Sequence, residues 1–517
     1  MSDPKLTRSA DDTAFFGHPR GLSTLFFTEM WERFSYYGMR AILVLYMTKA
    51  PELGGLGYSD KLGNLVYGLY TGIVYLLSLL GGWIADRFIG QRKAVLWGGI
   101  LIMCGHICLA IPLVPSFFGG LVLIAIGTGL LKPNISTIVG QLYAPEDERR
   151  DAGFSIYYMG INIGAGVSPL VIGFLAQSES FRSVLARFGM TPTDAWHFGF
   201  AAAAVGMFLG VVQYVVGAPK LKEAGLHPVP PKDAAEAARN KKRLIWILVA
   251  LFGLPAVLGG LAASGAVTLS AEGVGYGALV VLLLVATGFF YAMFRMATWT
   301  SAERKRIFAI LALFFGAVFF FSIFEQAGST FTLFADRNTD NRLPILGWEF
   351  PSSYWQSVNA ALIIILAPVF AGLWTALVRR HKNPPWPVKF GLGLILVGIG
   401  CLIMVPAAQI ASSGAKAGPG WLFSLYLLHT CAELCLSPVG LSNTTKIAPS
   451  QIAGLAMGVW FMGTGIGNYL AGMYGGLTQD LPMVTLFMVM AIPPVVAGLA
   501  FLALNRPLRN LTPDDHH

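Results

Sequence analysis

The sequence predicts an all-α integral membrane protein with about fourteen membrane-spanning helices. Of its 517 residues, 55% are hydrophobic and only 12% are charged, whereas a soluble domain carries about 25% charged residues. Apolar runs of about 20 residues or more recur along the whole chain, and a helix of that length crosses a bilayer. The runs are too long and too continuously apolar for barrel strands, which alternate over about ten residues.

The candidate spans fall into groups of six, two and six. They lie at 24–48, 62–85, 94–113, 117–140, 152–176, 194–217, 244–264, 273–295, 307–334, 353–378, 388–410, 420–443, 452–476 and 483–503. A basic stretch with several prolines, from about 218 to 243, separates the first six spans from the next two. We therefore expect a six-helix bundle in 1–218, a cytoplasmic linker with an inserted hairpin in 219–300, and a second six-helix bundle in 301–517.

The distribution of basic residues predicts the orientation in the membrane. If both termini are cytoplasmic, the inner loops hold most of the lysines and arginines that lie between spans, including the cluster at 239–243. This asymmetry is typical of cytoplasmic loops. No cleavable signal peptide precedes the first span, which agrees with a cytoplasmic N-terminus. The net charge of +9 is then explained by these loops, and we expect no nucleic-acid partner.

Few ionisable residues lie inside the spans, where they are costly and usually functional. Away from the ends of the spans they are Glu29, Glu32, Arg33, Arg40, Lys132, Glu325 and Glu433, with two histidines, His106 and His429. The three bases nearly balance the four acids, so these groups could pair across a central cavity. Each histidine is interpreted either as a hydrogen-bonded core residue or as a proton carrier.

The first span concentrates four of these charges. Glu29, Arg33, Tyr36 and Arg40 recur at i, i+4, i+7 and i+11, so they share one helix face, and Glu32 lies beside them. We expect this face to line water or substrate. Two acids around one base leave a carboxylate free to take up a proton; the alternative is a structural salt bridge.

Two late spans carry a second group of polar residues. Glu433 has His429 one turn before it and Ser437 one turn after it. The following span presents one small-residue face, formed by Trp460, Gly463, Thr464, Gly467 and Asn468. This face indicates either close helix packing or, around Trp460, the wall of a pocket.

Other classes of membrane protein are disfavoured. A membrane enzyme needs a nucleophile–base pair or a metal cluster at membrane depth, and the sequence offers neither. A channel filter would show rings of like charge, whereas the charges here are mixed. We expect no cofactor and no metal, because the five cysteines lie in apolar runs as small core residues; they are Cys104, Cys108, Cys401, Cys431 and Cys435.

Several motifs resemble known transporter signatures. Residues 81–93 (GGWIADRFIGQRK) resemble the inter-helix loop of the major facilitator superfamily, with one extra residue between Gly90 and Arg92. Residues 29–40 (EMWERFSYYGMR) resemble the first-span signature of the proton-dependent oligopeptide transporter family. The same family's later motifs are resembled, in order, by residues 154–164, 355–359 and 433–441. The inserted hairpin resembles the bacterial branch.

The resemblance implies a major facilitator fold of two six-helix bundles, with a site between inverted repeats near the midplane. It implies a monomer in the bacterial plasma membrane that imports di- and tripeptides with protons. Proton coupling would involve Glu29, Glu32, Arg33 and Glu325. Substrate would be bound by Arg40, Lys132, Tyr36, Tyr37, Tyr75, Asn162, Asn359, Glu433, Ser437 and Trp460. The expected gates are the ion pairs Arg40–Glu325 and Lys132–Glu433.

Within this resemblance the substrate has an alternative. Some members of the family carry nitrate or other small anions, and an acid such as Glu433 in the pocket would repel an anion. One departure concerns pocket shape: Phe321 stands where many relatives have tryptophan. We therefore expect a peptide carrier with one altered side-chain pocket.

Overall fold

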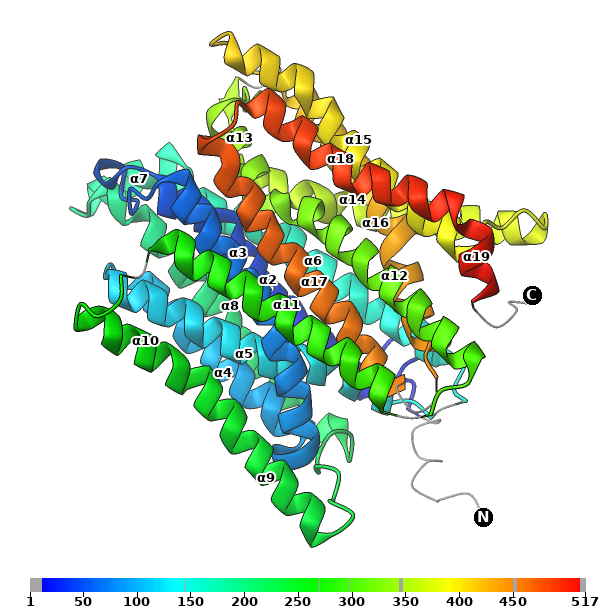
Figure 1. Cartoon of the computed structure of the whole chain (residues 1–517). Coiled ribbons are helices and arrows are strands. Elements are labelled where there is room, and N and C mark those ends of the chain that lie inside the picture. The colour runs from blue at the N-terminus through cyan, green and yellow to red at the C-terminus, as the bar shows by residue number, and fades with distance from the viewer. Residues whose placement is uncertain are drawn as a thin grey trace.

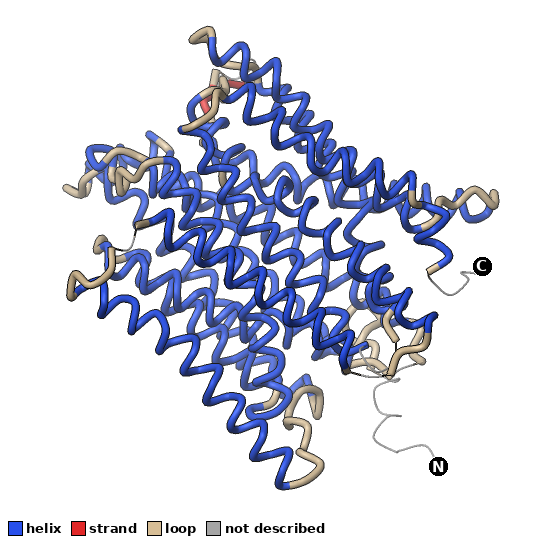
Figure 2. The backbone as a smooth tube through the Cα atoms, in the orientation of Figure 1, coloured by secondary structure: helices blue, strands red, loops and turns tan. Residues whose placement is uncertain are grey.

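The computed structural model describes residues 12–144, 146–268, 270–296, 298–343, 347–449 and 453–511. These residues are almost entirely helical, as Figure 2 shows, and helices cover all fourteen predicted spans. They are α2 (Arg20–Thr48), α3 (Asp60–Ile84), α4 (Gln91–Ala110), α5 (Val114–Gln141), α6 (Arg149–Gln177), α8 (Ala195–Gly217), α9 (Ala234–Leu248) with α10 (Leu254–Ala263), α11 (Ala271–Arg295), α12 (Ser301–Phe324) with α13 (Thr330–Arg337), α14 (Trp355–Arg379), α15 (Trp386–Ser412), α16 (Pro419–Ile447), α17 (Ala453–Gly476) and α18 (Met483–Ala503). The predicted fold class is confirmed.

Twelve segments of the described residues are long and apolar enough to cross a membrane by themselves. The helices α2 and α17 are not among them, since α2 carries five charged residues and α17 is rich in glycine. Other helices shield both of them: α2 packs against α6 and α8, and α17 packs against α3 and α12. A helix with polar groups can therefore lie at membrane depth without exposing them to lipid.

Shorter elements complete the described chain. A π-helical turn (Ala85–Ile89) extends α3, while α7 (Glu179–Arg187) and α19 (Asn505–Asn510) are short helices. A small antiparallel ribbon joins β1 (Arg342–Leu343) to β2 (Trp348–Glu349), with Arg342 opposite Glu349. The sequence did not indicate this ribbon.

Two details of the predicted spans are wrong, the start of one helix and the continuity of another. The helix α9 begins at Ala234, inside the stretch predicted as a loop, because the Asp233 side chain caps it by accepting a hydrogen bond of 2.6 Å from the Glu236 amide. The predicted span 307–334 is not one continuous helix. It is interrupted after α12 by a 3₁₀ turn, η6 (Glu325–Gly328), before α13 begins.

Buried apolar side chains gather in two clusters. One contains residues between Leu22 and Leu221 together with Leu333, and the other contains residues between Leu282 and Leu508. We call the chain before residue 219 the first half and the chain after residue 300 the second half. The domain limits 1–218, 219–300 and 301–517 remain our proposal. The two cores support the separation of the first half from the second, and hairpin residues between Leu282 and Trp299 contribute to the second core.

The two halves meet along two helix pairs, α3 with α17 and α6 with α14. At the first pair, a Cβ added to Gly68 would lie 2.7 Å from the Gly472 Cα, and one added to Gly72 would lie 3.1 Å from the Gly465 carbonyl oxygen. The two backbones are therefore in direct contact, as small residues permit between membrane helices.

The two helices of the inserted hairpin differ in their packing. The helix α11 lies against both α3 and α17, whereas α9 and α10 run along one edge of the molecule (Figure 1). None of the residues in the most apolar stretch of 234–262 is buried inside the protein. The membrane-spanning part of the first hairpin helix is therefore mostly exposed to lipid.

Candidate functional site

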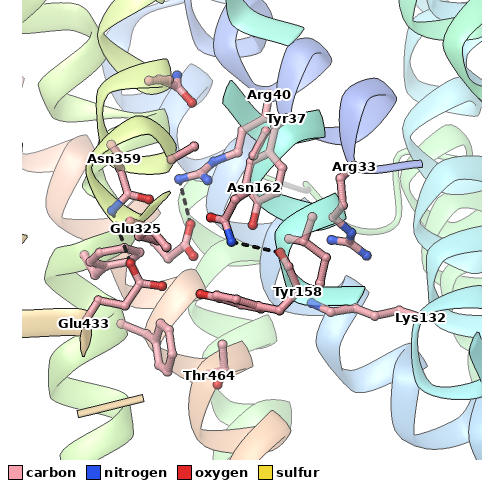
Figure 3. A pocket seen from close by; sticks show the side chains of 18 of the residues that line it. Arg33, Tyr37, Arg40, Lys132, Tyr158, Asn162, Glu325, Asn359, Glu433 and Thr464 are labelled. Atoms are coloured by element: carbon pink, nitrogen blue, oxygen red, sulfur yellow. Dashed lines mark hydrogen bonds and ion pairs between the residues drawn. The ribbon is translucent and has the colours of Figure 1, made fainter. Parts of the chain in front are cut away.

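A central cavity of about 560 Å³ lies between the two halves. Helices of both halves supply its walls, so most of the charged residues predicted at membrane depth come together here (Figure 3). Its lining includes these predicted residues: Glu29, Arg33, Tyr37, Arg40, Tyr75, Lys132, Asn162, Glu325, Asn359, Glu433 and Trp460. Three other predicted residues, Glu32, Tyr36 and Ser437, do not line the cavity.

A buried ion triad occupies one wall. The Arg33 Nε lies 2.8 Å from Glu29 Oε1 and 2.6 Å from Glu32 Oε2, and all three side chains are at most 4% exposed. Glu29 and Arg33 reach the cavity, whereas Glu32 lies behind them. One base thus serves two carboxylates, and Glu29 Oε2 accepts no hydrogen bond from any described residue.

The second charged contact joins the two halves across the cavity. The Arg40 Nη2 lies 2.8 Å from Glu325 Oε2, and Arg40 Nε donates a hydrogen bond of 2.8 Å to the Tyr67 hydroxyl. That hydroxyl in turn donates to the Glu325 carbonyl at 3.4 Å. Arg40 and Glu325 are 6% and 9% exposed, so the pair is almost removed from water.

The break between α12 and α13 positions this contact. The buried Gln326 side chain donates to the Ser322 carbonyl (3.1 Å) and to the Ala471 carbonyl of α17 (3.0 Å). Its oxygen accepts from the hydroxyls of Ser329 (2.9 Å) and Thr330 (2.7 Å). These side-chain hydrogen bonds replace helical ones that the 3₁₀ turn lacks.

Lys132 has no acidic partner among the described residues. Its Nζ lies 3.9 Å from the centre of the Tyr75 ring, a cation–π contact. The predicted ion pair between Lys132 and Glu433 is not formed in this conformation, because the two residues contact other groups on opposite walls. Lys132 is therefore a cation facing the cavity without a counter-charge in bonding distance.

Glu433 is held by neutral groups on the second half. Its Oε2 accepts a hydrogen bond of 3.2 Å from Asn359 Nδ2, which also donates to the Thr430 hydroxyl at 3.0 Å. No described base lies within ion-pair distance of Glu433. Figure 3 shows the Tyr158 side chain pointing from the first half toward this carboxylate.

Aromatic and amide side chains complete the cavity. Arg40 lies 5.6 Å from the centre of the Tyr37 ring, and Asn162 Nδ2 donates to the Tyr158 carbonyl at 3.0 Å. Phe321, which departs from the resembled pattern, meets Trp460 edge-to-face at 6.0 Å. The small-residue face predicted on α17 serves both suggested purposes: Trp460 and Thr464 line the cavity, and Gly463 and Gly467 pack on α12.

The histidines and several other residues extend this picture. His429 reaches the cavity and its Nε2 lies 3.1 Å from the Val397 carbonyl, whereas His106 is fully buried without a hydrogen-bond partner among the described residues.

Sequence reasoning missed Tyr67, Tyr158 and Gln356. Tyr158 and Gln356 lie inside the quoted motifs 154–164 and 355–359, so those motifs carried a usable signal.

Polar contacts join the halves at one end of the cavity. Lys49 Nζ lies 2.7 Å from Asp336 Oδ2, and the Arg337 guanidinium donates two hydrogen bonds, of 2.6 and 2.8 Å, to Asp60. Gln177 Nε2 donates to the Ser352 hydroxyl at 2.9 Å. This end, where α2 finishes and α3 begins, is the end predicted to face outward.

Comparisons with known proteins agree with this architecture. A curated relative from Bacillus subtilis (strain 168), "Uncharacterized transporter YclF", is 39% identical and aligns over 98% of this chain and 97% of its own. "Peptide transporter YePEPT" from Yersinia enterocolitica is 36% identical with the same two coverages. A crystal structure of a peptide transporter POT in complex with sulfate matches with a TM-score of 0.88 at 38% identity, covering 99% of each chain.

A family model also matches the chain: residues 92–492 match the model described as the POT family. A POT family transporter solved in complex with 5-aminolevulinic acid also matches, with a TM-score of 0.87 at 34% identity over 97% of this chain and 99% of that one. The family match over most of the sequence, together with relatives at 36% and 39% identity along nearly its full length, shows that this chain belongs to the POT family of membrane transporters.

Proposed function

We propose that the protein is a proton-coupled symporter that imports di- and tripeptides by alternating access. Relatives named for peptide transport support the substrate class. So do structural neighbours, one solved with alafosfalin and one with a thioalcohol-conjugated peptide. The cavity of about 560 Å³ falls within the usual range of small-molecule sites.

One observation carries the proposal. Lys132 and Glu433 face the cavity from opposite halves, and neither has an oppositely charged partner among the described residues in bonding distance. A peptide zwitterion supplies both missing charges, a carboxylate for Lys132 and an ammonium group for Glu433. Recognition of the two peptide termini does not depend on the peptide side chains, which suits a carrier of many different peptides.

The ion triad supports proton coupling. Arg33 contacts both Glu29 and Glu32, so protonation of one carboxylate leaves Arg33 with a partner. The net charge of the triad can then change without leaving an isolated buried charge, which would be costly. We propose Glu29, Glu32 and Arg33 as the coupling group, with Glu325 responding through Arg40.

Substrate binding would compete with the closed gate. Arg40 is now occupied by Glu325, but a peptide carboxylate near Lys132 would offer it another anion. A ligand shifts a conformational equilibrium only through a difference in its affinity for the two states. Exchange of the Arg40 partner, and formation of a Lys132–Glu433 contact once peptide leaves, would provide that difference.

An anion carrier is the alternative within the family. Glu433 opposes it, because a desolvated carboxylate in the pocket repels nitrate and similar ions. We further propose the bacterial plasma membrane as the location, with both termini cytoplasmic, since the described loops there are basic and the named relatives are bacterial. A single chain encloses the cavity, which supports function as a monomer.

The direct test is uptake into proteoliposomes. With an imposed inward proton gradient, the wild type should accumulate radiolabelled dialanine above equilibrium, and a proton ionophore should abolish this accumulation. Glu433→Gln should reduce uptake, whereas Glu52→Gln, the same change at an exposed position of the described chain, should not. Gradient-driven nitrate uptake without dialanine uptake would establish the alternative.

A further inference from the structure

The first helix of the hairpin encloses a basic pocket against the end of α3. The pocket has a volume of about 390 Å³ and lies where α9 begins, at the end of α3 that is predicted to face the cytoplasm. Arg87 Nη1 fixes this arrangement through an ion pair of 3.0 Å with Glu236 Oε1. The pocket is lined by Trp83, Arg87, Lys232, Asp233, Glu236, Arg239, Asn240 and Arg243.

The acids of this pocket are already engaged. Glu236 binds Arg87 through one oxygen and accepts from the Lys232 amide (2.8 Å) through the other, and Asp233 caps α9. Arg239 and Arg243 form no ion pair or hydrogen bond with any described residue. Four basic and two acidic side chains line the pocket, so it carries a net charge of +2 and offers free guanidinium donors, the groups best suited to phosphate.

An apolar groove continues from the basic pocket into the membrane region. It has a volume of about 560 Å³ and is lined by Leu80, Trp83, Trp246 and Ile247, with Lys242 beside them. It shares Trp83, Arg239 and Arg243 with the basic pocket. The two spaces thus form one site with a charged mouth and an apolar body.

Water is a poor occupant of the apolar part. The apolar stretch of 234–262 has no residue buried against the rest of the protein, so the gap between α9 and α3 is not closed by side chains. Filling such a gap with hydrocarbon is favoured over hydrating it. Tryptophans such as Trp83 and Trp246 are typical of the membrane–water interface.

We propose that this composite site binds one anionic phospholipid. Arg239 and Arg243, with Arg87 and Lys232 nearby, would hold the headgroup phosphate, and an acyl chain would lie along Trp83 and Trp246. Basic pockets between membrane helices on the cytoplasmic side are known to suit anionic headgroups. The lipid would fasten α9 to the first half, where protein contacts are sparse.

Native mass spectrometry of the full-length protein in detergent tests the proposal. Phosphatidylglycerol and phosphatidylcholine with identical acyl chains are titrated separately. We expect one tightly held phosphatidylglycerol on the wild type. Arg239→Gln/Arg243→Gln should weaken this binding by about tenfold or more, since it removes two charge-assisted contacts. Phosphatidylcholine should bind equally to both proteins.

The control variant removes two arginines elsewhere on the face of the protein that is predicted to be cytoplasmic. Arg379→Gln/Arg380→Gln, at the exposed end of α14, should retain the tightly held lipid. Trp246→Ser leaves the basic pocket intact and should weaken phosphatidylglycerol binding through the groove alone, which keeps the test valid if the double arginine variant fails to fold.

Three outcomes would overturn the proposal. They are unchanged phosphatidylglycerol binding in both pocket variants, an equal loss in the pocket and control variants, and full displacement of the lipid by inorganic phosphate. The last result would assign the pocket to a free anion and remove the role of the groove.

Discussion

A methyl group at Gly328 should disturb the contact that joins the two halves. Gly328 ends the 3₁₀ turn between α12 and α13, and a Cβ there would overlap the Tyr67 hydroxyl and lie 2.7 Å from Arg40 Nε. Real Cβ atoms do not approach other atoms this closely, so Gly328→Ala must displace the Tyr67 and Arg40 side chains from their present positions. The hydrogen bond from Arg40 to Tyr67 and the ion pair with Glu325 should both weaken.

The size of the effect follows from the crowding. Overpacking by one methyl group costs typically about 1–3 kcal/mol, and about 1.4 kcal/mol corresponds to a tenfold change in an equilibrium. If the cost falls only on the conformation with Arg40 and Glu325 in contact, the population should shift away from it by about 5- to 150-fold. Peptide uptake should slow accordingly, because one of the two alternating states becomes rare.

Distances between spin labels would measure the shift. Labels at Ser183 and Ser413, exposed positions on different halves at the predicted outer end, should move apart in Gly328→Ala. Gly372→Ala is the matched control, since a Cβ at Gly372 meets no atom within 4 Å. If both variants give the wild-type distance distribution and the same uptake, the contact at Gly328 does not govern the outer end.

Four further outcomes are expected. Glu433→Gln should lower affinity for free peptides by about ten- to a hundredfold, the loss of one charge-assisted hydrogen bond, but change binding of N-acetylated peptides little; equal losses in a competition assay would place its role in the bundle. Lys132→Gln should weaken free peptides but not C-terminally amidated ones, and an identical loss for both would disprove carboxylate recognition. Glu32→Gln should abolish gradient-driven accumulation while peptide counterflow persists; surviving accumulation would remove Glu32 from proton coupling. Burial and the Arg149 guanidinium hold the pKa of His18 below its ordinary value, against a smaller opposing effect of Asp147. The contribution of neutral His18 to stability should therefore be present above about pH 6.5 and decline below it. The acid-induced drop in Tm should accordingly be smaller in His18→Gln.

The sequence predicted the spans well because bilayer thickness sets both their length and their composition. It predicted less well which residues on a charged helix reach the cavity. Successive residues of a helix are separated by about 100°, so Arg33 and Tyr37 lie on one side of the charged stripe of α2, and Glu32 and Tyr36 lie on the other. The cavity contacts only the first side, and that choice depends on how the neighbouring helices pack.

Long-range contacts explain the other differences. The break after Phe324 is held by hydrogen bonds from Gln326, one of them to Ala471, which local helix propensity does not reveal. The unformed pair of Lys132 and Glu433 has a different cause: a sequence indicates which charges are available, but each conformation selects its own pairs. By contrast, the helical start at Ala234 had a readable signal in the Asp233 cap.

The glycine contacts between α3 and α17 affect how easily the halves can move. In most helix pairs, side chains of one helix interdigitate with those of the other, and rotation requires them to separate. At Gly68 and Gly472 the two backbones touch directly, so no side chains have to disengage there. The two helices can therefore turn past each other with little loss of packing, whereas the side chain of a leucine at Gly68 would meet the α17 backbone and force the two helices apart.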